Sequence, residues 1–235
     1  MSIVGNRCTT AIAITGVAAI ILGISACSGQ GVAGLGSSSP SQMSGAARPI
    51  GRAAIVKHAA PNTAIQLVPG TTVGQAVFPE GDTATGGQGQ QVNGINCKMA
   101  LDNAFHHHAH LSLFVNGVQY AIPRGTGMKN PGKNNFIYHA DCYYWIHTHD
   151  DTGILHMEPP AAFNFSLKQY FHIWGEPLST TGVAGYNGLV TVFVNSIQVF
   201  VDPNTIVLNP FDQVTLEVGL PVVTPPVYIF PPGYP

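Results

Sequence analysis

The chain has 235 residues, and its composition excludes one class of function at once. Charged residues make up 9% of it, against about 25% in an average soluble protein, so uncharged polar side chains must build its wet surface. The formal net charge is −2, and no segment gathers Lys and Arg. Binding to nucleic acid needs such clusters to displace counterions, so we exclude nucleic acid as a partner.

The first 26 residues have the plan of a signal peptide, with Arg7 near the start and an apolar run from Ala11 to Ile24. The following tetrapeptide, Ile24-Ser25-Ala26-Cys27, resembles the bacterial lipobox, where the chain is cut before a cysteine that carries a diacylglycerol. This interpretation predicts lipidation of Cys27 and a membrane as partner. The alternative is an uncleaved transmembrane helix, although the segment is at the short limit of about 18 residues. Both interpretations predict that the domain is exported.

Ser28 resembles the signal that sorts lipoproteins of Gram-negative bacteria to the outer membrane. We therefore expect a lipid-anchored protein of the cell envelope, at the outer membrane, either in the periplasm or exposed at the surface. Residues 27–60 are rich in Gly, Ser and Ala, which predicts a tether. One β-rich domain at 61–220 and a Pro-rich tail at 221–235 would follow.

Most of the domain predicts β-structure. Residues 111–122 form two alternating runs around Asn116-Gly117, a strong hairpin signature. Residues 190–201 repeat this pattern, which either a duplication or the common demands of β-structure would explain. A closing strand is expected at 213–219. The predicted fold class is mainly β, an antiparallel sheet that is sandwich or barrel-like, built from hairpins with one short α-helix.

The single predicted helix begins after Ser166, a good N-cap, and ends near Gly175. Its apolar stripe consists of Leu167, Tyr170, Phe171 and Trp174. A stripe at helical spacing is usually core, so we expect it to pack on the sheet rather than to hold a cofactor.

Nine of the ten histidines lie between residues 106 and 172. Side chains alternate between the two faces of a strand, so His106, His108 and His110 share one face while His107 lies on the opposite, apolar face. Residues 143–158 predict a hairpin with its turn at 150–153. This second segment carries His147, His149, His156 and Glu158.

Pairs of histidines one residue apart on a strand are an arrangement that holds metal ions. The candidate ligands are His106, His108, His110, His147, His149, His156 and Glu158. A single ion would take only two of the first three, because the outer two α-carbons lie about 13 Å apart on a flat strand. A dinuclear centre would use the whole set. The competing interpretation is a wet sheet face of hydrogen-bonded imidazoles, but six histidines at this spacing beside a carboxylate favour metal.

Imidazole ligands suit copper, zinc, iron or nickel and argue against magnesium and calcium. Copper or zinc is the expected cofactor. We assign no metal role to His107, His58 or His172, and the pattern does not decide the role of His139.

Removal of Cys8 with the signal peptide and acylation of Cys27 leave two thiols in an oxidising compartment. Cys97 and Cys142 are therefore expected to form a disulfide that holds the two histidine segments in register. The alternative makes them soft metal ligands. For the Pro-rich tail, docking against the domain or a partner competes with a frayed end.

Three motifs of the chain carry a resemblance to known proteins. H-x-H-x-H-L with F-V-N-G spans residues 106–117, C-x-Y-W-x-H-T-H-D-x-x-G-x-x-H-x-E spans 142–158, and F-x-L-x-Q-x-F-x-x-W-G spans 165–175. Residues 95–219 thereby resemble an uncharacterised family of bacterial secreted proteins and lipoproteins. The family pattern has an apolar residue at position 107, which agrees with leaving His107 out of the site. The resemblance implies that the histidines and Glu158 of these motifs form a site, but it implies no particular reaction.

The leading hypothesis is an exported lipoprotein that binds a transition metal through histidines on adjacent strands, for metal binding or handling. One alternative is a metal-dependent hydrolase or oxidoreductase with an open coordination position and with Glu158 or Asp150 as general base. The other is a structural or adhesive surface protein, in which the histidines could be changed without consequence.

Overall fold

The computed structural model describes residues 63–81, 86–101 and 103–235. The predicted signal peptide, the lipidation site Cys27, the tether at 27–60 and His58 lie outside these residues. The described residues cover most of the predicted domain together with its tail.

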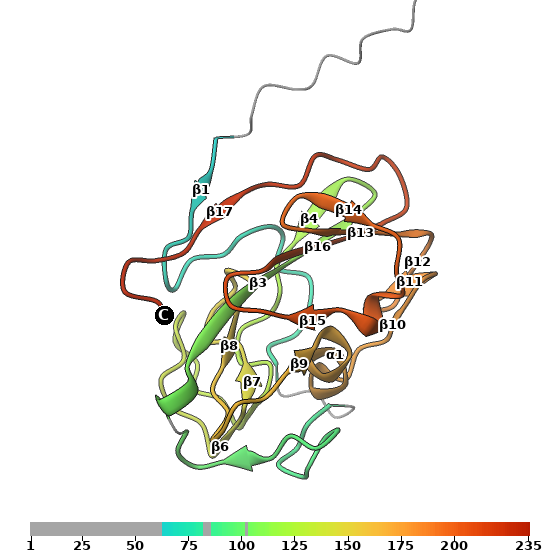
Figure 1. The fold of residues 1–235 in the computed structure, drawn as a ribbon. Coiled ribbons are helices and arrows are strands. Elements are labelled where there is room, and N and C mark those ends of the chain that lie inside the picture. Colours follow the sequence, from blue (N-terminus) through green and yellow to red (C-terminus); the bar gives the residue numbers. More distant parts are fainter. Residues whose placement is uncertain (1–62, 82–85, 102) are drawn as a thin grey trace, which may run out of the picture. The chain divides into compact units, whose positions relative to one another are not determined.

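A seven-stranded mixed sheet organises the fold, with the long strand β3 at its centre (Figure 1). The strand order is β14-β13-β16-β3-β8-β7, and β4 pairs with β3 as well. The β16–β3 pair is parallel and the other pairs are antiparallel. The strands are β3 (His107–Val115), β4 (Val118–Tyr120), β7 (Ile146–His147), β8 (Ile154–Met157), β13 (Val190–Val194), β14 (Ile197–Val199) and β16 (Gln213–Val218).

Short strands form four smaller sheets around the main one. They pair β1 (Ile65–Gln66) with β17 (Tyr228–Ile229), β9 (Phe165–Ser166) with β15 (Val207–Leu208), β6 (Cys142–Tyr144) with β2 (Cys97–Lys98) and β5 (Met128–Lys129), and β11 (Gly182–Val183) with β10 (Leu178–Ser179) and β12 (Tyr186–Asn187). Two 3-10 turns complete the elements, η1 (Asn103–Phe105) and η2 (Pro203–Thr205). None of the sheets in the described residues closes into a barrel. The predicted class, mainly β with one short helix, is confirmed.

The hairpins predicted at 111–122 and 190–201 are present, and the hairpin predicted at 143–158 is present as the antiparallel pair of β7 and β8. β3 turns into β4 through Asn116 and Gly117, whose φ angles of 50° and 77° are positive, as a tight hairpin turn requires. β13 turns into β14 through Asn195 and Ser196, also with positive φ. The closing strand is β16. It lies between the first two hairpins, so β3 and β13 are not neighbours.

The helix α1 (Leu167–Trp174) begins and ends where the sequence predicts. The Ser166 side chain accepts a hydrogen bond from the Gln169 backbone, the Gln169 side chain accepts one from the Ser166 backbone, and Gly175 ends the helix at φ 84°. The predicted apolar stripe is buried in the main core. Within the described residues, no helix is long and apolar enough to cross a membrane.

The apolar face of the main sheet packs against α1. Leu111, Leu113 and Val115 of β3 join Val214 and Leu216 of β16 in the same core as the helix stripe. These residues alternate along their strands with the polar ones, as predicted. The alternation therefore places His108 and His110 on the other face, which we call the histidine face.

The tail covers the histidine face. The Tyr228 ring packs on the His110 ring at 4.0 Å between centroids, and the backbone of Tyr228 exchanges hydrogen bonds with the Gln213 side chain. The Val223 N–H donates to Glu217. Tyr228 is buried with Leu67 and Ile154 in a second, smaller core. Of the two predictions for the tail, docking on the domain is the one that the structure shows.

Cys97 and Cys142 form a disulfide between β2 and β6, as predicted. The bond makes both sulfurs unavailable as thiolate ligands, so the alternative role of these cysteines as metal ligands is wrong. β6 continues into β7, which carries His147, so the bridge anchors the second histidine segment.

Candidate metal centre

Three histidines stand in one row across three neighbouring strands. His108 of β3 pairs with His156 of β8, and His156 pairs with His147 of β7. Residues opposite each other on paired strands point to the same face, and neighbouring strands are about 4.8 Å apart. The strand register therefore brings these imidazoles together without any loop.

Three further side chains join the row from the ends of the same strands. His106 precedes β3, Glu158 follows β8, and His149 follows β7 by two residues. The chain reverses between His149 and β8 at Gly153, which has φ 86°, and a Cβ there would lie 2.4 Å from the Leu111 carbonyl oxygen. Only glycine fits this turn, which sets the position of β8 against β3.

The donor atoms form two groups that could each hold a metal ion, and His156 belongs to both. One group is His147, His149, His156 and Glu158, and the other is His106, His108 and His156. Within each group the donor atoms lie within 4.8 Å of one another. A buried cluster of histidines with one glutamate is thus present, and it could coordinate a metal ion.

Hydrogen bonds to backbone oxygens fix which nitrogen of three rings carries the hydrogen. His147 Nδ1–H donates to the Tyr144 carbonyl oxygen at 2.9 Å, and His149 Nδ1–H donates to that of Ile137. His108 Nδ1–H donates to the Pro235 oxygen at 3.0 Å. An oxygen of this kind can only accept, so the Nε2 atom of each neutral ring bears a lone pair. Such outer contacts are typical of histidines that bind metals.

The Nε2 atoms that bear these lone pairs face nitrogens of neighbouring imidazoles. His147 Nε2 lies 3.0 Å from His149 Nε2, and His108 Nε2 lies 3.1 Å from His156 Nδ1. The second contact can be a hydrogen bond donated by His156. The first cannot, because both hydrogens are already committed to carbonyl oxygens. Two nitrogens bound to one ion at 2.0–2.1 Å would be about 2.9–3.4 Å apart, which matches this separation.

Burial keeps the imidazoles neutral. Loss of solvation lowers the pKa of His108 to about 4 and lowers the pKa of His147 and His156 well below 6.5, and repulsion from neighbouring histidines adds to this effect. The same burial lowers the pKa of His106 and His149. Neutral imidazole is the form that binds metals, so the cluster is ready for a cation at neutral pH.

Glu158 is the only carboxylate in either group. Burial raises its pKa to about 7. Its Oε1 atom lies 3.2 Å from His106 Nε2, 3.9 Å from His156 Nδ1 and 4.0 Å from His147 Nε2. His106 Nε2 is buried and, despite the nearby Glu158, has no hydrogen bond of acceptable geometry. A cation between these atoms would favour the ionised carboxylate and give His106 Nε2 a partner.

Two of the predicted site residues lie outside both groups. His110 is opposite Ile154 rather than a histidine, and its Nε2–H donates to the Thr152 carbonyl oxygen at 2.8 Å. Asp150 accepts hydrogen bonds from the Gly70 and Thr152 backbones, so its oxygens stabilise the turn. The structure brings the other candidate ligands together and places these two beside them.

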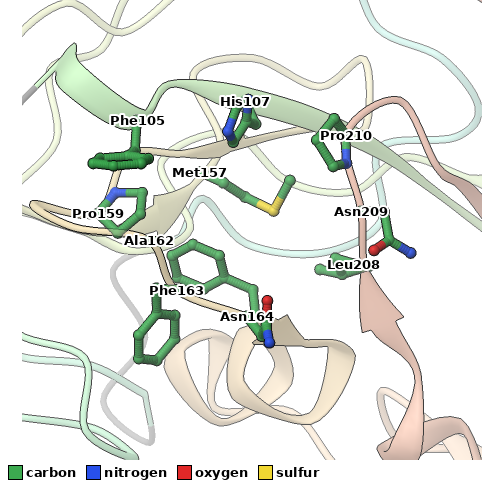
Figure 2. A pocket seen from close by; sticks show the side chains of 11 residues that line it. Phe105, His107, Met157, Pro159, Ala162, Phe163, Asn164, Leu208, Asn209 and Pro210 are labelled. Atoms are coloured by element: carbon green, nitrogen blue, oxygen red, sulfur yellow. The ribbon is translucent and has the colours of Figure 1, made fainter.

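His107 lies on the opposite side of β3, as its position in the alternation predicts. It lines a pocket of about 260 Å³ together with Met157, its partner on β8, and with Phe105 and Phe163. Figure 2 shows these side chains around the pocket. The strand pair separates this pocket from the histidine face. Neither His139 nor His172 belongs to a donor group, and both are exposed.

The sequence interpretation missed the contribution of the tail to the cluster. The Tyr234 ring lies 4.3 Å from the His108 ring and 5.6 Å from the His156 ring, centroid to centroid, and the Pro235 oxygen accepts from His108. The only signal was the aromatic content of the Pro-rich tail, which does not say where the tail docks.

Comparison with known proteins adds no family. No family model, no curated protein and no solved structure matches this chain. We therefore infer the function of the chain from the geometry of the cluster.

Proposed function

We propose that this protein binds a transition metal ion, copper or zinc, through His147, His149 and His156 with Glu158. The observation that carries the proposal is the 3.0 Å approach of His147 Nε2 and His149 Nε2, each of which has its Nδ1 hydrogen committed to a carbonyl oxygen. Two lone pairs at this distance repel each other unless a cation lies between them. The low pKa of both rings disfavours a proton in that place, which leaves a metal ion.

The donor set indicates the kind of metal. Three imidazoles and one carboxylate suit borderline ions such as Cu(II) and Zn(II), whereas magnesium and calcium prefer oxygen ligands. Copper has the higher intrinsic affinity for such sites.

The surroundings support binding or handling of the metal rather than turnover of a substrate. His147 and His156 are buried, and the tail packs over the neighbouring His108. Of the two candidate general bases, Asp150 is engaged in hydrogen bonds within its turn, and Glu158 is one of the four proposed ligands of the metal.

Metal analysis of protein purified without a metal-affinity step, and again after loading with Cu(II) or Zn(II), tests the proposal. We expect stoichiometric metal in the wild type and loss of the ion from the first group in the double variant His147→Ala/His149→Ala. The His139→Ala variant is the matched control, because this exposed histidine is outside both groups. Absence of bound metal after loading would contradict the proposal and favour a structural role.

We also propose that the protein acts in the cell envelope as a lipoprotein anchored through Cys27. The lipobox-like tetrapeptide supports this proposal, and the Cys97–Cys142 disulfide is typical of an oxidising compartment. In a bacterial host given a labelled fatty acid, the full chain should take up label and sediment with membranes. The Cys27→Ser variant should lose the label, and an equally labelled variant would show that the anchor is elsewhere.

A further inference from the structure

The cluster contains more donors than one ion of the proposed kind can use. Zinc takes four ligands, and the first group already provides His147, His149, His156 and Glu158. His106 and His108 are left over, although they lie in the same buried cluster and point to the same face.

One ion cannot bind all of these donors in the observed arrangement. Two ligands of one ion at 2.0–2.1 Å are at most about 4.2 Å apart. The donors of His106 and His108 do not fall with those of His147, His149 and Glu158 into a single group, even at the wider limit of 4.8 Å. The cluster therefore has two centres rather than one larger one.

The second centre has the features of a ligand site in its own right. His108 Nε2 bears a lone pair, because its Nδ1–H donates to the Pro235 oxygen. His106 Nε2 is buried without a hydrogen bond of acceptable geometry. The two rings are neighbours, with 4.5 Å between their centroids, and the donor atom of His156 lies within 4.8 Å of the donor atoms of both.

Glu158 stands between the two centres. Its Oε1 atom is 3.2 Å from His106 Nε2 in one centre and 4.0 Å from His147 Nε2 in the other. A carboxylate has two oxygens, so it can bind one ion with each. Ions that share such ligands are about 3.5–4 Å apart.

We propose that His106 and His108 hold a second transition metal ion, so that the cluster is a dinuclear centre in which Glu158 bridges the two ions and His156 lies between them. This inference rests on the proposed function of the first group. Because Glu158 is the only anionic ligand in either group, the two ions share one negative charge and repel each other. The second ion therefore binds more weakly.

Titration of the metal-free full chain with Cu(II), followed by native mass spectrometry, tests the proposal. We expect two ions per chain, taken up in two steps of different affinity. The His106→Ala variant should bind one ion, and it carries little risk of misfolding because the His106 side chain is 29% exposed. The His139→Ala control should bind two.

Electron paramagnetic resonance provides a second measurement, because two Cu(II) ions that share a bridge couple magnetically. The fully loaded wild type should show a coupled or silenced signal, and the His106→Ala variant should show the signal of one isolated Cu(II). One ion in both the wild type and this variant would overturn the second site and leave the proposed function intact. Two ions with uncoupled signals would overturn the Glu158 bridge, and no bound ion would overturn the proposed function itself.

Discussion

His108 and His110 show how neighbouring residues of one type on one strand face can differ in role. The register of β3 against β8 places His108 opposite His156 and His110 opposite Ile154. His108 thereby belongs to a donor group, whereas His110 donates to the Thr152 oxygen and packs on Tyr228. The partner on the next strand, rather than the histidine itself, decides between ligand and structural side chain.

This difference predicts the effect of His110→Ala. The substitution removes a buried ring and leaves the Thr152 oxygen without its donor, so the free energy of unfolding should fall by about 2 to 4 kcal/mol. The metal content should not change. Urea denaturation and metal analysis of the same sample would measure both effects. Loss of an ion together with the ring would show that His110 is a ligand.

The buried histidines also predict how the stability of the metal-free protein depends on pH. Their pKa is lower in the folded chain than in the unfolded chain, so the unfolded chain binds more protons as the pH falls below 6.5. The contribution of these histidines to stability is therefore complete above pH 6.5 and declines towards pH 4. For His110 alone, with its pKa of about 4, the loss at pH 5 is about 2 kcal/mol.

Glu158 acts in the opposite sense. Its pKa of about 7 in the folded chain favours folding while the carboxyl is protonated, and this contribution is lost as the pH rises from 4.5 to 7. Burial raises the pKa of Asp150, Glu176 and Glu217 as well. Six histidines have a lowered pKa and outnumber these carboxyls, so we expect a net loss of stability between pH 7.5 and pH 5. Urea midpoints at the two values would measure it. A higher midpoint at pH 5 would contradict the expected balance.

The disulfide holds the second histidine segment in place. It joins β2 to β6, and it closes a chain segment with a sequence separation of 45 residues. By loop entropy such a bond contributes about 4 kcal/mol. The variant Cys97→Ala/Cys142→Ala should lose stability of this order, measured by urea denaturation beside the oxidised wild type. An unchanged midpoint would contradict this contribution of the bond to stability.

The sequence predicted those elements whose signals are local. Asn116-Gly117, the Ser166 cap and the alternation of Leu111, Leu113 and Val115 each depend on a few neighbouring residues, and the structure confirms them. The row of His108, His156 and His147 follows from two predicted hairpin segments once their register is known. Register between β3 and β8 depends on contacts distant in sequence, which is why the sequence could not separate His110 from the donor groups.

Local sequence patterns could not predict the pairing of strands that are distant in the sequence. The parallel pairing of β3 with β16 and of β1 with β17 joins segments that have no sequence signal for each other. The competing interpretation of the histidines was a wet sheet face, yet His108, His110 and Ser112 are buried beneath the tail. Burial of that face is a property of the whole molecule.

The main sheet is covered on both sides, and the two covers differ in kind. α1 covers the apolar face with a continuous core, whereas the tail, paired with β1, covers the histidine face through a few aromatic side chains. The part nearest the donors is the last part of the tail, where Tyr234 and Pro235 contact His108. Access of small molecules to a bound metal should therefore depend on these residues more than on the sheet.

Two truncations would separate the roles of the tail. Deletion of 232–235 removes Tyr234 and the Pro235 oxygen but keeps Tyr228, so a chelator should extract the metal faster while the free energy of unfolding falls by less than in a deletion that also removes Tyr228. Deletion of 223–235 also removes Tyr228 from its buried place against His110, which should cost about 3 to 5 kcal/mol or more. The absorbance of a chromogenic chelator follows the extraction, and urea denaturation follows the stability. Equal extraction rates in the wild type and the shorter deletion would mean that the metal leaves by another route, past the partly exposed His106.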